Sequence, residues 1–385
     1  MPRFEGRLPG KLPHVGTTIF TVMSRLAAEH GALNLSQGFP DFAAPAPLLE
    51  AVARHMRAGE NQYAPMAGAA PLREAIAAMV EAGHGVRYDP EREITVTAGG
   101  TEAIFCAITC AVRPGDEVIL LEPAYDSYAP AVELSGGTAL RAQLTFPGYR
   151  PDWAQVRALL SPRTRLLVVN TPHNPTGAVF TATDLAALEA LTRGTDALVL
   201  SDEVYEHMIY DGARHHGCVA SAALRDRSFV VGSFGKTFHV TGWKVGYVLA
   251  PPELTAELRR VHQFVTFAVN TPVQLALADH LAEAASWRGL SAFYQRKRDL
   301  FREGLRATRL EPLACAGTYF QLASYARVSD EPDVALAERL TRELGVAAIP
   351  VSVFYQAPRQ DRVLRFCFAK SDETLARACE RLARL

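Results

Sequence analysis

The pentapeptide Ser233-Phe234-Gly235-Lys236-Thr237 directly follows the apolar run Phe229-Val230-Val231. A lysine at the end of a buried strand, between small residues, is poorly explained as a solvated surface charge. It is well placed to form a Schiff base with an aldehyde cofactor. Ser233 and a second base, Lys244, can then hold the phosphate of that cofactor.

Two other interpretations of this segment are possible. Gly235-Lys236-Thr237 resembles the end of a P-loop, but that pattern needs a glycine five positions before Gly235, where the chain has Val230. An exposed loop lysine is the other alternative, and the segment alone leaves it open because most lysines are solvated.

Two further apolar runs end in polar residues. Arg165–Val169 leads into a proline-rich turn with Asn174, and Ala197–Leu200 leads to Asp202 and Tyr205. Asn170 lies 32 positions before Asp202, which lies 34 before Lys236. Each gap suits one strand–helix–strand crossover of about 30 residues. Ligands of open α/β sheets bind at the carboxyl ends of the strands, so Asn174, Asp202, Tyr205 and Lys236 are expected in one crevice.

These four residue types suit a pyridine aldehyde. A carboxylate at Asp202 can keep the ring nitrogen protonated, which makes the ring an electron sink. Tyr205 and Asn174 can hydrogen-bond the phenolate oxygen of the ring. Taken singly, Asp202 could be a helix N-cap and Asn174 a turn residue. Their joint spacing with Lys236 favours the site.

The chain resembles the class I/II pyridoxal-phosphate aminotransferases from near Phe20 to its C-terminal strand. Within them it looks most like the methionine aminotransferase and kynurenine/glutamine transaminase branch, to which Leu35–Phe42 and the strand with Arg365 point. The resemblance implies the cofactor pyridoxal 5'-phosphate. It is carried by Leu35–Phe42 (LSQGFPDF), Asn61–Pro65 (NQYAP), Asn170–Gly177 (NTPHNPTG), Ser201–Tyr205 (SDEVY), Ser233–Thr237 (SFGKT) and Leu364–Phe368 (LRFCF).

The turn Gly99-Gly100-Thr101 follows an expected strand and opens an expected helix at Glu102. Free N–H groups at a helix start bind phosphate, although an ordinary capped helix would look the same locally. The resemblance implies that this turn holds the cofactor phosphate with Ser233 and Lys244. Many relatives have arginine at the position of Lys244, and lysine lacks its bidentate fork.

The resemblance also assigns the remaining site. Tyr125 would stack on the pyridine face. Arg365, in an otherwise apolar strand, would bind the α-carboxylate of the substrate with Asn174 and the backbone of Gly38. The other expected contacts are Phe20 in the side-chain pocket, Tyr63 reaching the phosphate across a dimer interface, and Phe267 and Asn270 near that interface.

At 385 residues the chain is expected to form two domains. Residues 48–281 predict a doubly wound, mostly parallel α/β sheet. Val245–Ala250 starts only 9 residues after Lys236, too soon for a parallel crossover, so one antiparallel strand is expected. Residues 1–47 and 282–385 predict a smaller α+β domain. The expected strands are Ile94–Thr97, Glu117–Leu121, Arg165–Val169, Ala197–Leu200, Phe229–Val231, Val245–Ala250, Gly317–Leu322, Val346–Pro350 and Val363–Phe368, followed by a helix over Glu373–Leu385.

Composition narrows the partners. The formal net charge of −1 gives no reason to expect nucleic acid or an anionic membrane. No apolar run approaches the roughly 20 residues of a membrane span, and the start lacks the apolar block of a signal peptide. Six scattered cysteines indicate a reduced, cytoplasmic protein. No metal is expected at Cys106 and Cys110, because no nearby histidine or cysteine completes a ligand set.

The sequence therefore predicts a homodimeric aminotransferase that acts on an amino acid and a 2-oxo acid by a ping-pong mechanism, with Lys236 as base and acid. Phe20, Tyr63 and Tyr125 favour a large side chain, as in methionine, phenylalanine, tyrosine, leucine or kynurenine. No second arginine is evident for a distal carboxylate. The alternatives are a cysteine-conjugate β-lyase on the same site and a cofactor-sensing regulator, which would need an added DNA-binding helix-turn-helix.

Overall fold

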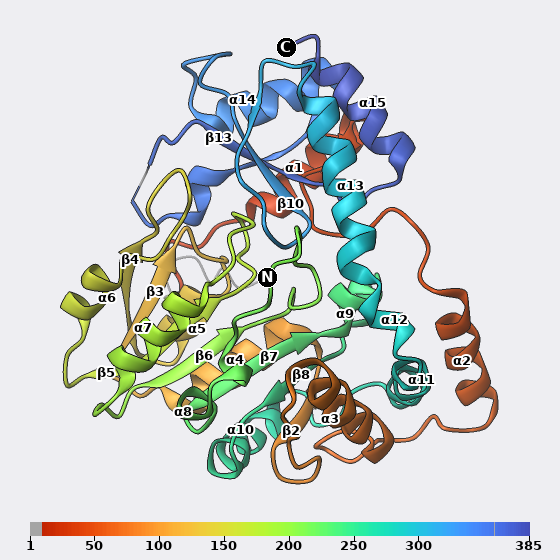
Figure 1. Ribbon diagram of the computed structural model, residues 1–385, viewed down its shortest axis with the longest axis vertical. Coiled ribbons are helices and arrows are strands. Elements are labelled where there is room, and N and C mark those ends of the chain that lie inside the picture. Colours follow the sequence, from red (N-terminus) through yellow and green to blue (C-terminus); the bar gives the residue numbers. More distant parts are fainter. Residues whose placement is uncertain (1–9, 358) are drawn as a thin grey trace, which may run out of the picture.

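A seven-stranded sheet forms the centre of the computed structural model, which describes residues 10–357 and 359–385 (Figure 1). Its neighbouring strands are parallel except β8, which pairs antiparallel with both β2 and β7. The predicted α/β class and the single antiparallel strand are confirmed. In spatial order the strands are β2 (Ile94–Thr97), β8 (Gly246–Leu249), β7 (Ser228–Ser233), β6 (Leu198–Asp202), β5 (Thr164–Asn170), β3 (Glu117–Glu122) and β4 (Thr138–Gln143).

Helices cover both faces of this sheet because its inner strands are apolar on both sides. In β3, Val118 and Leu120 pack with α4 and α5, whereas Ile119 and Leu121 belong to the core of the opposite face. The helices of this part are α2 (Ala46–Arg57), α3 (Ala70–His84), α4 (Gly99–Ala111), α5 (Tyr128–Leu134), α6 (Trp153–Leu159), α7 (Ala182–Thr192), α8 (Ala222–Arg225), α9 (Phe234–Thr237), α10 (Pro252–Val265) and α11 (Thr271–Ala282).

A smaller antiparallel sheet lies in the upper part of Figure 1, with strands in the order β12 (Ile349–Pro350), β13 (Val363–Cys367), β10 (Phe320–Ser324) and β9 (Glu311–Pro312). The N-terminal segment joins this part, because β1 (Leu33–Asn34) pairs with β11 (Val346–Ala347). The division into residues 48–281 and 1–47 with 282–385 stays a prediction, and residues 1–9 lie outside the described residues. The helices here are α1 (Ile19–Glu29), α12 (Ala285–Arg288), α13 (Leu290–Leu305), α14 (Asp333–Arg339) and α15 (Asp372–Leu382).

Several elements differ from those expected, among them the short strands β1 and β9, which were not predicted, and α15, which ends at Leu382. Strand β4 was missed because it is an edge strand whose Thr138 and Gln143 are exposed, so it lacks an apolar run. The strand expected over 317–322 begins at Phe320, and the one expected over 346–350 is divided between two sheets. Helix α4 begins at Gly99 instead of Glu102, because Gly99 adopts a φ of 77° that turns the chain sharply out of β2.

Within the described residues, no helix combines the length and the apolar character that crossing a membrane requires.

Candidate functional site

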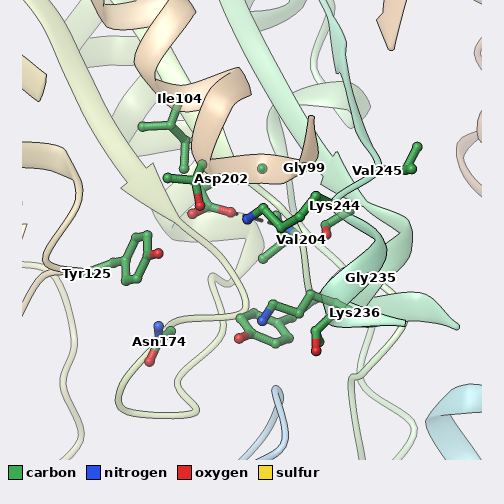
Figure 2. A pocket seen from close by; sticks show the side chains of 15 residues that line it. Gly99, Ile104, Tyr125, Asn174, Asp202, Val204, Gly235, Lys236, Lys244 and Val245 are labelled. Atoms are coloured by element: carbon green, nitrogen blue, oxygen red, sulfur yellow. Dashed lines mark hydrogen bonds between the residues drawn. The ribbon is translucent and has the colours of Figure 1, made fainter. Parts of the chain in front are cut away.

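One cavity of about 160 Å³ collects ten of the residues that the sequence singled out. Figure 2 shows Tyr125, Asn174, Asp202, Lys236 and Lys244 approaching it from separate elements. The lining is completed by residues that the sequence analysis did not name in this role. The predicted members are Gly99, Gly100, Thr101, Tyr125, Asn174, Asp202, Tyr205, Ser233, Lys236 and Lys244, and the additional ones are Ile104, Val204, Gly235, Thr241 and Val245.

Strand register explains the convergence. Strands β5, β6 and β7 are parallel neighbours, with Asn170 opposite Asp202 and Asp202 opposite Val231. The polar residue that follows each apolar run therefore reaches the same edge of the sheet, as the spacing predicted. Lys236 extends beyond β7 on the single-turn helix α9.

Lys236 lies between aromatic rings. Its Nζ is 6.0 Å from the ring centroid of Tyr205 and 5.8 Å from that of Tyr319. Burial lowers its pKa to about 8. A larger share of unprotonated amine near neutral pH makes this lysine a better nucleophile and base than an exposed one.

Asp202 is a buried carboxylate held by a tyrosine that the sequence analysis missed. Tyr128, at the start of α5, donates to Asp202 Oδ2 at 2.6 Å, and the Val204 N–H donates to Oδ1 at 3.3 Å. Burial raises the pKa of Asp202 to about 6 even though these donors act against it. Within the described residues Asp202 makes no salt bridge, so its carboxylate can pair with a cationic ring nitrogen in the cavity.

The turn at the start of α4 is set by close packing. A Cβ on Gly246 would come within 2.7 Å of the Gly232 carbonyl oxygen and 3.0 Å of the Gly100 nitrogen. This turn therefore lies directly on β8. The Lys244 Nζ is 3.4 Å from the position of a Cβ on Gly99. A helix start with free N–H groups beside an amine is suited to bind a phosphate.

Arg365 connects three segments next to this cavity. It donates from Nη1 to Asn174 Oδ1 at 2.7 Å and from Nη2 to the Ser36 carbonyl oxygen at 2.8 Å. Its side chain is buried and its guanidinium carbon lies 3.9 Å from the Phe320 ring centroid. Burial lowers its pKa to about 10, and Nε is buried with no hydrogen-bond partner among the described residues. The contact with Ser36 was not foreseen, because a backbone acceptor leaves no mark in the sequence.

Gly38 and Phe20 also lie near Arg365 but do not line the cavity. A Cβ on Gly38 would come within 2.7 Å of the Phe320 ring, so a glycine is needed there. The Gly38 carbonyl oxygen accepts from Tyr319. The Phe20 ring, on α1, is 5.2 Å from the Arg365 guanidinium carbon.

Tyr63 lies apart from the cavity within its own chain. Its side chain is 84% exposed and meets the ring of Phe267 edge-on, with centroids 5.5 Å apart. It lines a separate open hollow that includes Asn270. A role for Tyr63 in the site of another chain stays a prediction.

Cys106 has a histidine neighbour that the sequence analysis did not find. His262, on α10, lies with Glu102 and Cys106 so that one ligand atom of each falls within 4.8 Å of the others. The structure thus places a histidine beside Cys106 that the sequence did not indicate. The sequence could not reveal it, because His262 lies 160 positions from Glu102. Hydrogen bonds among the three side chains account for their proximity.

Residues 31–382 match the family model "Aminotransferase class I and II". The chain belongs to the class I and II aminotransferases. Enzymes of this family generally depend on pyridoxal phosphate. The family membership confirms the resemblance that the motifs indicated.

Several members of the family are similar over almost the whole chain. A methionine aminotransferase of Escherichia coli (strain K12) is 53% identical over 97% of both chains. A crystal structure from Escherichia coli that identifies a methionine aminotransferase function superposes with a TM-score of 0.96, covering 98% of this chain and 99% of that one. An N-succinyldiaminopimelate aminotransferase structure from Mycobacterium tuberculosis is 39% identical with a TM-score of 0.95, covering 98% and 99%. The human kynurenine–oxoglutarate transaminase 1 is 35% identical over 93% of both chains.

The hydrogen bond from Tyr128 yields the first prediction. Asp202 must be ionised to pair with a cationic ring nitrogen, so affinity of the apoenzyme for pyridoxal phosphate should fall as the pH drops through about 6. Tyr128→Phe removes a donor that favours the ionised form, so the midpoint of this fall should move to higher pH. Titrations of both proteins over a pH range that brackets this pKa measure the shift. Ionisation of the cofactor itself affects both proteins equally, so it does not contribute to the difference between them. An unchanged midpoint would contradict the role of Tyr128.

Proposed function

We propose that this aminotransferase uses pyridoxal phosphate to transfer the amino group of an amino acid with a large apolar or aromatic side chain to a 2-oxo acid, in a ping-pong reaction. The observation that carries the proposal is the joint placement of Lys236, Asp202 and Arg365 around one crevice. Methionine, phenylalanine, tyrosine, leucine and kynurenine are the donors that we infer.

The residues present fit this cofactor. When bound, pyridoxal phosphate supplies an aldehyde that reacts with amines and a ring that takes up an electron pair. The amine of Lys236 faces the cavity, and Asp202 is a buried carboxylate with no cationic partner among the described salt bridges. Tyr125 would lie against the ring face, and Tyr205 and Asn174 would hold the phenolate oxygen. The phosphate would be bound by Gly99, Gly100, Thr101, Ser233 and Lys244.

Lys236 also handles the proton of the reaction. Burial among aromatic rings holds its pKa at about 8, so Nζ can accept the Cα proton of the amino acid and give it up again within one half-reaction. Neither Tyr205 nor Tyr319 competes for that proton, because burial keeps the pKa of both phenols far above neutrality.

Arg365 is the group that we assign to the α-carboxylate of the substrate. A guanidinium carries five N–H donors in a fixed fork, and the contacts with Asn174 and Ser36 use two of them. Because Asn174 accepts through Oδ1, its Nδ2 is free to donate toward the cavity. The Arg365 contact thus orients Asn174 for the cofactor and leaves donors for the substrate.

The neighbouring hollow favours an apolar side chain. The ring of Phe354 lies 5.5 Å from the guanidinium carbon of Arg365. Phe354 also lines a hollow of about 560 Å³. Apolar residues dominate this wall, and its one charged member among the described residues is Asp126, an acid. A second carboxylate on the substrate side chain would face Asp126, and none of the described residues that line this hollow is a cation. The remaining wall consists of Val15, Gly16, Thr17, Thr18, Ile19, Val22, Ser127, Pro130 and Val353.

The second prediction tests the covalent attachment. Purified protein should be yellow, and treatment with borohydride should fix the cofactor to Nζ of Lys236. Peptide mapping by mass spectrometry locates the adduct, with the Lys236→Ala protein as the control that should carry none. An adduct on a different lysine would refute the assignment.

The third prediction concerns the donor. With a common 2-oxo acid, kcat/KM should be at least about tenfold higher for methionine or phenylalanine than for aspartate, because a carboxylate buried without a cation costs more than about 1.4 kcal/mol. Asp126→Asn removes the like charge and should narrow this ratio. A wild-type preference for aspartate, or a ratio that Asp126→Asn leaves unchanged, would contradict the proposed side-chain pocket. Release of pyruvate and ammonia from cysteine conjugates without a 2-oxo acid would reveal β-lyase activity.

We also propose that the protein is a homodimer with shared active sites in a reducing, cytoplasmic setting. The support is the exposure of Tyr63, a predicted phosphate contact, beside the exposed apolar residue Phe267. The six cysteines are buried free thiols, which suits a reducing compartment.

The fourth prediction tests the shared site by complementation. Lys236→Ala and Tyr63→Ala subunits should each be nearly inactive alone. After subunit exchange, a heterodimer contains one site with both native residues, so mixing should restore part of the activity. If confirmed heterodimers remain inactive, Tyr63 serves its own chain.

A further inference from the structure

A buried trio of side chains lies beneath the first turn of α4, outside the set of residues assigned so far. Glu102 accepts through Oε1 from the Cys106 thiol at 2.8 Å, and through Oε2 from the backbone N–H of Ala98 at 2.9 Å. The Nδ1 of His262 lies 2.8 Å from Glu102 Oε1, and its Nε2 lies 3.0 Å from the Met66 carbonyl oxygen. The His262 side chain is fully buried.

Both ring nitrogens of His262 face oxygen atoms that accept hydrogen bonds. One nitrogen lies against a carboxylate and the other against a backbone carbonyl. Burial by itself would raise the pKa of Glu102, but His262 and the donors Cys106 and Ala98 hold that pKa below its usual value. Burial keeps the Cys106 thiol neutral by raising its pKa. His262 therefore connects the Glu102 carboxylate to the Met66 carbonyl through its two ring nitrogens.

His262 and Glu102 together join two segments that have separate tasks in the proposed function. Ala98 is the N-cap of α4 and directly precedes the Gly99–Thr101 turn of the cavity. Met66 lies three positions after Tyr63, in the segment between α2 and α3. His262 comes from a third element, α10, and touches both.

We propose that His262 is a positioning residue for the cofactor phosphate, which holds the Gly99–Thr101 turn through Glu102 and the Tyr63 segment through Met66. This inference rests on the proposed function. Breaking the Glu102 contact frees the carboxylate that caps α4, so the N–H groups and Thr101 lose their alignment toward the phosphate. The loss of alignment does not reach the ring end of the cavity, where Asp202 ends β6 and Tyr205 lies in the turn that follows it.

The test compares two ligands that differ only in the phosphate. Apoenzyme is titrated with pyridoxal phosphate and with pyridoxal, which has the same aldehyde and ring. The variants are His262→Gln, whose amide reaches toward Met66 but not Glu102, and the nearly isosteric Glu102→Gln. Glu117→Gln is the matched control. Like Glu102, Glu117 is a buried carboxylate with a basic partner, in its case Arg163, but it begins β3 at the opposite end of the strands.

The substitutions should weaken binding of pyridoxal phosphate and leave binding of pyridoxal nearly unchanged. His262→Gln and Glu102→Gln should each weaken binding of pyridoxal phosphate at least about tenfold, the loss of one charge-assisted hydrogen bond, and change pyridoxal binding less than about twofold. Glu117→Gln should change neither. Equal losses for both ligands, as a merely structural role or partial unfolding would give, overturn the inference, and so does unchanged binding of both.

The contact of His262 with Met66, here called the Met66 arm of the proposal, has its own test. His262→Asn keeps an amide donor near the position of Nδ1 and loses the reach to Met66. If this arm acts through Tyr63, Tyr63→Phe should weaken pyridoxal phosphate binding less in the His262→Asn background than in the wild type. Equal effects in the two backgrounds overturn this arm. Failure of wild-type protein to bind pyridoxal phosphate on Lys236 would instead refute the proposed function, so the two failures are distinguishable.

Discussion

The pairing of three adjacent parallel strands, β5, β6 and β7, is the constraint on which the rest of the site depends. It sets Asn170 against Asp202 and Asp202 against Val231, so the chain leaves all three strands at one edge of the sheet. A shift of one residue in this pairing would turn Asp202 to the other face of the sheet. The apolar faces of these strands, buried under helices on both sides, fix the register and with it the positions of Asp202 and Lys236.

Burial then determines the chemistry of the groups at that edge. The same desolvation lowers the pKa of Lys236 to about 8, raises that of Asp202 to about 6 and lowers that of Arg365 to about 10. Burial disfavours the charged form of each group, and a partner of opposite charge in the cavity would stabilise it again. Tyr128 moderates this effect at Asp202, and the aromatic rings around Lys236 and Arg365 exclude water without consuming their N–H groups.

The N-terminal segment is part of the site because of Arg365. This residue lies on β13 in the smaller sheet, yet it contacts Asn174 after β5 and the backbone at Ser36. The pairing of β1 with β11 brings that backbone into place. Segments from the start, middle and end of the chain therefore meet at one guanidinium, which couples binding of a carboxylate to the packing between the two sheets.

The fold class, the antiparallel β8 and ten of the fifteen residues that line the cavity could be predicted from the sequence, because each is encoded locally. An apolar run followed by a polar residue marks a strand end, and the 32- and 34-residue spacings mark crossovers. Short motifs such as Ser233–Thr237 indicated the family. Local pattern failed at β4, where an edge strand has too few apolar residues to be recognised.

The side chains that hold the site residues in place follow from three-dimensional packing and could not be predicted from the sequence. Tyr128 and Asp202 are 74 positions apart, and His262 and Glu102 are 160 positions apart. A tyrosine or histidine in a helix gives no local sign of its distant partner, because the partner is set by how helices pack on the sheet. The contact of Arg365 with the Ser36 carbonyl is likewise hidden, since every residue has such a group and only the three-dimensional packing selects one.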